Sequence, residues 1–175
     1  GIMTTGKAYL DVRQALADLG ISEAAAGDLG LRIYKVGLTW PLEREGAPRF
    51  AAGLKDVIVV EEKRGFIEDQ LVKLLYNLDA TQRPSVVGKT DETGTLLLPS
   101  EGELSPTIVA HAIVARLKRL GVASQGFEQR LARLDSFEKI ALTPTSKNSG
   151  RRSSARAART TPRPRSRRDL GPWPE

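Results

Sequence analysis

Charged side chains gather in one short segment, VEEKRGFIEDQ, which spans residues 60–70. Adjacent carboxylates could exchange protons with a substrate. Acidic side chains are also favoured beside the first turn of a helix. Structural ion pairs produce similar clusters more often than catalysis does, so we assign no catalytic residue here. The candidate domain-interface or ligand-edge residues in this segment are Glu61, Glu62, Lys63, Arg64 and Glu68.

The first seven residues, GIMTTGK, have the G-x-x-x-x-G-K spacing of a phosphate-binding loop. The next residue is Ala8, where such loops need a hydroxyl that reaches Mg²⁺. The four residues between the glycines also have the composition of a strand. We therefore predict a strand-to-helix turn at Gly6 and no cofactor-binding or metal-binding residue.

Three further features have both a functional and a structural interpretation. Trp40 precedes Pro41, and we include it among the candidate interface residues while expecting it to anchor packing. His111 has no cysteine and no second histidine near it, which favours a boundary position over a ligand or base. Leu131, Leu134 and Phe137 have helical spacing and predict a docking face.

The elements that must position these residues alternate between strands and helices. Short apolar runs predict strands at residues 2–5, 31–36, 56–61 and 85–88. Helical periodicity predicts helices at residues 7–19, 22–29, 47–54, 64–78, 105–120 and 127–142. Ser22 and Ser105 are expected N-caps, and Pro106 suits a first helical position.

This order of elements indicates an α/β fold, a three-layer open and mostly parallel sheet of about four strands. The residues that follow β-like runs, such as Glu61 and Glu62, are then expected at the carboxyl edge, where ligands of open α/β sheets gather. We expect an α/β domain at residues 1–120, an amphipathic helical connector at 121–142, and a disordered Arg/Pro/Ser-rich tail at 143–175.

The excess of positive charge lies in the tail, residues 143–175. The chain has 27 Lys and Arg against 21 Asp and Glu, a net charge of +6. Residues 143–175 hold nine of these bases and two of the acids, which leaves 18 bases and 19 acids in residues 1–142. The absence of cysteine excludes disulfides and thiolate metal sites and fits a cytoplasmic protein. No apolar run has the ~20 residues that a membrane-spanning helix needs, so we expect no membrane partner.

Four segments together resemble one known family, the indolepyruvate:ferredoxin oxidoreductases, which are fused bacterial 2-oxoacid oxidoreductases. They are TGKAYLDVRQAL (5–16), GLRIYKVGLTWPLE (30–43), VEEKRGFIEDQL (60–71) and LPSEGELSP (98–106). The resemblance covers residues 1–142. It implies an internal fragment similar to the transketolase C-terminal domain, located between two thiamine-binding domains.

The resemblance also implies an activity for the parent enzyme. Such an enzyme oxidatively decarboxylates aryl pyruvates to acyl-CoA with thiamine diphosphate, Mg²⁺ and iron–sulfur clusters, and it passes electrons to ferredoxin. None of the family's cofactor motifs falls in the matched region. The fragment is therefore expected to bind no cofactor and to be inactive alone. Its partners are the neighbouring thiamine-binding domains, with ferredoxin and coenzyme A engaged only through the parent.

The resemblance stops after Leu142, and the tail suggests a reason. With suitable synonymous codons, residues 151–164 read TPFFCSGCPHNTST in another frame, which resembles the start of the family's next thiamine domain. We therefore expect a frameshift, and coding DNA without that reading would refute it. Two alternatives stay open. The tail could make the chain a small nucleic-acid-binding protein with non-specific phosphate contacts, or the chain could be a stand-alone domain that assembles with separately encoded subunits.

Overall fold

The computed structural model of the protein describes residues 1–122 and 124–142. These residues belong to one compact unit, Gly1–Thr143. The predictions of a disordered tail, a frameshift and nucleic-acid contacts concern residues 143–175, and they lie outside the described residues.

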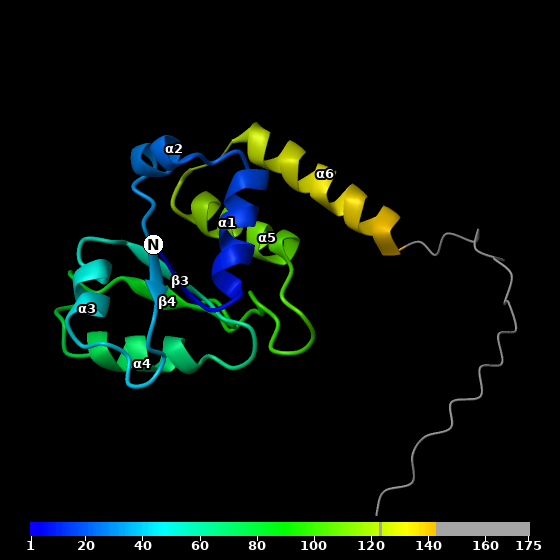
Figure 1. The fold of residues 1–175 in the computed structure, drawn as a ribbon. Coiled ribbons are helices and arrows are strands. Elements are labelled where there is room, and N and C mark those ends of the chain that lie inside the picture. Colours follow the sequence, from blue (N-terminus) through cyan, green and yellow to red (C-terminus); the bar gives the residue numbers. More distant parts are fainter. Residues whose placement is uncertain (123, 143–175) are drawn as a thin grey trace, which may run out of the picture. The chain divides into compact units, whose positions relative to one another are not determined.

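A four-stranded sheet forms the centre of this unit (Figure 1). Its strands are β1 (Ile2–Thr5), β2 (Ile33–Val36), β3 (Asp56–Val60) and β4 (Ser85–Val87). Their order across the sheet is β2-β1-β3-β4, and every neighbouring pair is parallel. Ile2 of the central strand pairs with Ile33 on one side and with Ile58 on the other. The predicted α/β fold is confirmed, with a sheet that is wholly parallel.

In residues 1–122 and 124–142, six helices connect and flank the strands. Their bounds are α1 (Ala8–Asp18), α2 (Glu23–Asp28), α3 (Gly46–Ala51), α4 (Phe66–Leu75), α5 (Pro106–Arg119) and α6 (Gln125–Leu142). Ser22 and Ser105 are the N-caps of α2 and α5, and their hydroxyls accept hydrogen bonds from Ala25 N and Ile108 N. Each predicted helix is present, but α3 and α4 each end three residues before the predicted limit, at Ala51 and Leu75.

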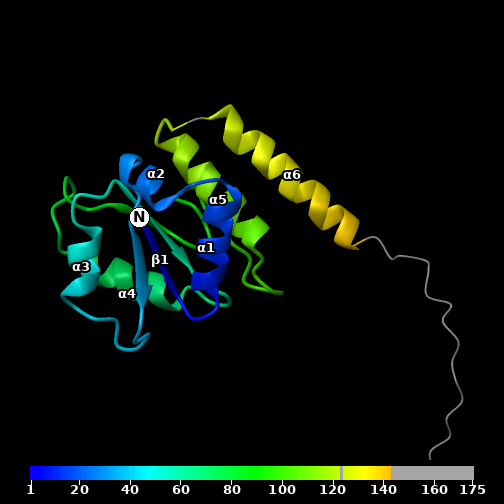
Figure 2. The same cartoon turned by 45° about the horizontal axis from the view of Figure 1, so that its top comes forward.

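Helices cover both faces of the sheet, with α1 and α5 on one face and α3 and α4 on the other (Figure 2). The side chains of strand β3 alternate between the two faces of the sheet. Val57 and Val59 belong to the core under α3 and α4, whereas Ile58 and Val60 belong to the core under α1 and α5. A strand covered on both faces needs apolar residues at every position, and this accounts for its unbroken apolar run.

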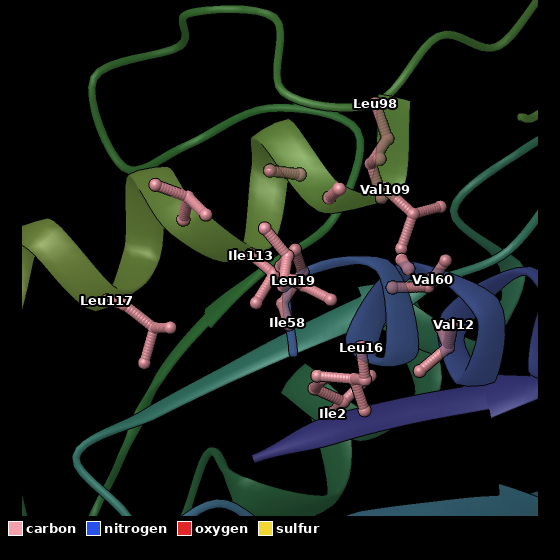
Figure 3. Close-up of a cluster of buried hydrophobic side chains, with 14 of the residues drawn as sticks. Ile2, Val12, Leu16, Leu19, Ile58, Val60, Leu98, Val109, Ile113 and Leu117 are labelled. Carbon is pink, nitrogen blue, oxygen red and sulfur yellow. The ribbon is translucent and has the colours of Figure 1, made fainter. Parts of the chain in front are cut away.

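The larger core lies between the sheet and helices α1 and α5 (Figure 3). Val12 and Leu16 of α1 and Ile113 of α5 meet Ile2 and Ile58 of the sheet there. Helix α6 extends the same core, because its Leu131 is buried in it. The segment expected as a connector thus contributes a side chain to the packed interior.

A buried ion pair lies at the amino-terminal end of β3. Arg116 of α5 donates from Nε to Asp56 Oδ2 at 2.8 Å, and its Nη1 donates to Glu92 at 2.8 Å. Both Asp56 and Arg116 are buried, while Arg119 approaches Glu92 from the outside. Asp56 Oδ1 has no hydrogen-bond partner within the described part of the chain. The pair ties α5 to the sheet edge opposite the candidate functional residues.

Candidate functional site

The strand order places one switch point at the carboxyl edge of the sheet. The chain runs from β1 to β2 on one side and then returns to β3 on the other, so the loops after β1 and β3 diverge. Ligands of open α/β sheets bind at such a point. A shallow cleft of about 360 Å³ lies there. It is lined by Thr5, Thr39, Glu61, Glu62, Lys63, Arg64, Phe66 and Ile67.

Glu61 caps helix α4 from the end of β3. Its carboxylate accepts hydrogen bonds from Ile67 N at 3.1 and 3.0 Å and from Glu68 N at 3.1 Å. The N-cap position itself is Gly65, which has no side chain to offer. A buried carboxylate on these amides satisfies the donors that every helix start leaves free. Glu61 therefore has a structural role that occupies both of its oxygens.

Glu62 lies outside this arrangement and faces Lys7 at 3.8 Å. The Lys7 ammonium also contacts Asp11 at 3.1 Å and Glu103 at 3.2 Å, and it donates to Leu104 O at 3.2 Å. Hydrogen bonds to Asp11 and Glu103 raise the pKa of Lys7 above its ordinary value. The lysine of the G-x-x-x-x-G-K spacing is thus held by carboxylates. The predicted turn at Gly6 is confirmed, since residues 2–5 form β1.

Glu68 is half-buried between two glycines. Its Oε2 accepts from Lys89 N at 3.1 Å. A Cβ added to Gly88 or Gly65 would lie 2.2 or 2.8 Å from that oxygen, so the two glycines make room for the carboxylate. Burial raises the pKa of Glu68 above its ordinary value; the hydrogen bond from Lys89 N opposes this shift, and repulsion by Glu61 adds to it.

Lys89 also lies at the carboxyl edge of the sheet, and the sequence analysis did not identify it. Its ammonium donates to the backbone oxygens of Glu61, Glu62 and Pro99, the last two at 3.1 Å. It thereby joins the loop after β3 to the loop that precedes α5. Burial lowers the pKa of Lys89, while the nearby carboxylates oppose this shift. A charged residue two positions after the Ser85–Val87 strand was the available signal, because parallel strands end at one edge of the sheet.

Trp40 lies against Phe66, with ring centroids 5.7 Å apart. The expectation that Trp40 anchors packing was wrong: 64% of its surface is exposed. The buried anchor of this loop is Leu42 instead, which is 3% exposed and donates its amide to Gln70 Oε1 at 2.9 Å. Pro41 follows Trp40 through a cis peptide bond.

Lys63 and Arg64 are exposed, and no carboxylate in residues 1–122 and 124–142 forms an ion pair with either side chain. Five of the six candidate residues lie in the segment 61–68, and the structure places the sixth, Trp40, against Phe66 of that segment. It separates them by role. Glu61 and Glu68 are bonded to backbone amides, whereas Lys63 and Arg64 remain available at the surface.

The other candidates lie elsewhere. His111, predicted at a boundary position, is exposed, with Nε2 2.8 Å from Asp135 Oδ1 of α6. The α6 stripe is split, since Leu131 is buried but 54% of Phe137 is exposed. Within the described ranges, no group of three or more His, Asp or Glu side chains is arranged to hold a metal ion.

Glu68 gives the first testable prediction. Its folded-state pKa lies above that of the unfolded chain, so the folded protein binds the extra proton and loses stability as the pH rises through the folded value. Glu68→Gln should therefore raise the free energy of unfolding at pH 7 and bring no gain at pH 3. Urea titrations at both pH values would measure this, with exposed Asp69→Asn as the control. A gain of equal size at both pH values would contradict the assignment.

An open parallel sheet, covered by helices on both faces and bearing its charged cluster at the carboxyl edge, defines a doubly wound α/β domain. A profile of the indolepyruvate oxidoreductase domain matches residues 1–141 of the chain. The chain therefore belongs to the indolepyruvate oxidoreductase domain family. No curated protein and no solved structure matches it, so the specific likeness to the transketolase C-terminal domain stays a prediction.

None of the helices in the described part of the chain has the length and apolar character needed to cross a bilayer.

Proposed function

We propose that this chain is a structural domain of a thiamine diphosphate-dependent 2-oxoacid:ferredoxin oxidoreductase and is inactive when isolated. One observation carries the proposal. The family match, residues 1–141, has nearly the same extent as the compact unit Gly1–Thr143. The family resemblance thus follows the packed body, and the parent activity would be the oxidative decarboxylation of aryl pyruvates to acyl-CoA.

The engagement of the carboxyl-edge residues supports a structural role. A general base needs a carboxylate that can reach a substrate proton. Glu61 is buried and accepts three hydrogen bonds from the start of α4. Glu68 is held by Lys89 N, and Glu62 faces Lys7. These side chains hold the loops and the helix start of this domain in place. We therefore assign them a structural role within the parent enzyme.

The cofactors of the proposed parent do not fit the residues of this chain. Iron–sulfur clusters are held by cysteine thiolates, and the sequence has no cysteine. The carboxylate oxygens of Glu61 already accept hydrogen bonds from backbone amides. We therefore place thiamine diphosphate, Mg²⁺ and the clusters in the neighbouring domains, together with the contacts to ferredoxin and coenzyme A. A cysteine-free chain also suits the cytoplasm, where we place the protein.

The test is an activity assay of the purified chain. With indolepyruvate, thiamine diphosphate, Mg²⁺, coenzyme A and ferredoxin, we expect no reduction of ferredoxin above the enzyme-free blank. A complete family enzyme assayed in parallel supplies the positive control. Turnover that scales with the concentration of the chain would refute the proposed structural role.

The tail carries a second candidate function. Nine of the 27 basic residues lie in residues 143–175, beside only two acids, and cationic segments bind nucleic acids in a salt-dependent manner. A deletion variant that ends at residue 142 distinguishes the two proposed functions, because it lacks the basic tail. Loss of a cellular phenotype on that deletion would favour nucleic-acid binding.

A further inference from the structure

Four exposed side chains form one surface at the carboxyl edge, which we call the aromatic–cationic patch. Its members are Trp40, Lys63, Arg64 and Phe66. We propose that this patch is a docking surface for an acidic protein segment of an adjoining domain, in which carboxylates flank an apolar side chain. This inference rests on the proposed function and names the contact through which the domain would join its neighbour.

The first argument is the exposure of large apolar groups. Trp40 is 64% exposed and Phe66 is 48% exposed. Single exposed apolar side chains are common, but adjacent ones that include a tryptophan mark contact surfaces. Trp40 and Phe66 are already in ring contact, so they present one continuous apolar area.

The second argument is that the patch is held in place before any partner arrives. Gln70 Nε2 donates to Thr39 O at 2.9 Å and to Phe66 O at 3.0 Å, while its Oε1 accepts from Leu42 N at 2.9 Å. One side chain thus fixes the loop that carries Trp40 to the helix that carries Phe66. A surface that is ordered in advance loses less entropy on binding.

The third argument is the sign of the available charge. Lys63 and Arg64 have no ion-pair partner in the part of the chain that the structure describes. The acids nearest to them are occupied: Glu61 by helix amides and Glu62 by Lys7. Asp69 is exposed in the first turn of α4, where the helix dipole favours its charge. Two free cations beside an apolar area call for an anionic and apolar partner.

The shape favours a macromolecule over a small ligand. The cleft beside the patch is shallow, and about half or more of each apolar side chain faces solvent. Small-molecule sites enclose most of the ligand surface. A protein segment can instead cover Trp40 and Phe66 with an apolar side chain while its carboxylates reach Lys63 and Arg64 at the rim.

The test uses the complete 175-residue chain as bait for a random dodecapeptide library displayed on phage. The selection includes counter-selection on a Trp40→Ala/Arg64→Glu variant. That variant keeps residues 143–175, so peptides that bind only the basic tail are removed. We expect the surviving peptides to place two or more Asp or Glu next to an aromatic or large aliphatic residue.

Single variants then define the contact. Arg64→Glu should weaken the selected peptides about tenfold, as loss of one charged interface contact does. Exposed Lys55→Glu, at the opposite edge of the sheet, should change binding less than about twofold. A library selected on Arg64→Glu should yield Lys or Arg in place of the acids. Peptides without acidic residues, peptides indifferent to Arg64, or no enriched peptide would overturn the proposal.

Two other occupants would also overturn it. Dimerisation in sedimentation equilibrium that Arg64→Glu abolishes would assign the patch to a second copy of the chain. Binding of 3-phenylpropanoate below about 1 mM, dependent on Trp40 and Arg64, would assign it to a small aromatic anion. These results are independent of the activity assay. Turnover by the isolated chain would refute the proposed function and leave the peptide preference of the patch intact.

Discussion

Replacing Arg116 by methionine is expected to lower the free energy of unfolding by about 3–5 kcal/mol, because it removes one member of a buried ion pair. Asp56 and Arg116 are 5% and 7% exposed, and Arg116 is within hydrogen-bond distance of both Asp56 and Glu92. Without the guanidinium, the buried Asp56 carboxylate would lose its ion-pair partner. Its Oδ1 already lacks a hydrogen-bond partner in the described structure.

Urea unfolding followed by circular dichroism measures this effect. Arg119→Met is the matched control, since Arg119 contacts the same Glu92 but is about half exposed, and its cost should stay below about 1 kcal/mol. Asp56→Asn/Arg116→Met should recover part of the loss. Equal losses for both arginine variants would show that burial of the pair is unimportant.

The second large effect concerns the candidate site. Glu61→Ala should lower the free energy of unfolding by about 2–3 kcal/mol, since it removes a charged acceptor and leaves buried amides unsatisfied. The amides of Ile67 and Glu68 lose their acceptor, and Gly65 cannot replace it. Glu62→Ala should cost less than about 0.5 kcal/mol, because Glu62 is more exposed and Lys7 keeps other carboxylates.

Hydrogen exchange adds a local measurement for Glu61. The amides of Ile67 and Glu68 should lose protection in Glu61→Ala while amides of β3 keep theirs. A uniform loss along the chain would contradict a capping role. Glu61→Gln should lie between wild type and alanine, because its amide oxygen still accepts but carries no charge.

Much of the fold could be predicted because local pattern and tertiary environment agree. The apolar run of residues 57–60 requires helices on both faces of a strand, and the structure supplies them. Ser22 and Ser105 each precede a helix, and their hydroxyls accept hydrogen bonds from amides of its first turn. These N-caps could therefore be predicted from the sequence. The order of strands across the sheet was not predictable, because pairing between distant strands depends on packing that no local pattern encodes.

The candidate site was predictable in place but only partly in role. Glu61 and Glu62 follow a buried strand, so their position at the carboxyl edge follows from topology. Their roles differ because only the Glu61 carboxylate reaches the amides at the start of α4, whereas Glu62 faces Lys7. Trp40 was misjudged because its apolar ring suggested burial, whereas Leu42 fills the interior. Lys89 acts across 28 residues on Glu61 O, a separation that sequence spacing does not reveal.

The central position of β1 affects how the chain emerges from the ribosome. Ile2 pairs with Ile58, so strand β1 waits for about 56 further residues to be synthesised before its second neighbour exists. At ~5–20 residues per second, this delay is roughly 3–11 seconds. During that time β1 lacks at least one of its two neighbouring strands. Translation speed through residues 6–60, and chaperones that bind unpaired strands, should therefore influence the yield of folded protein.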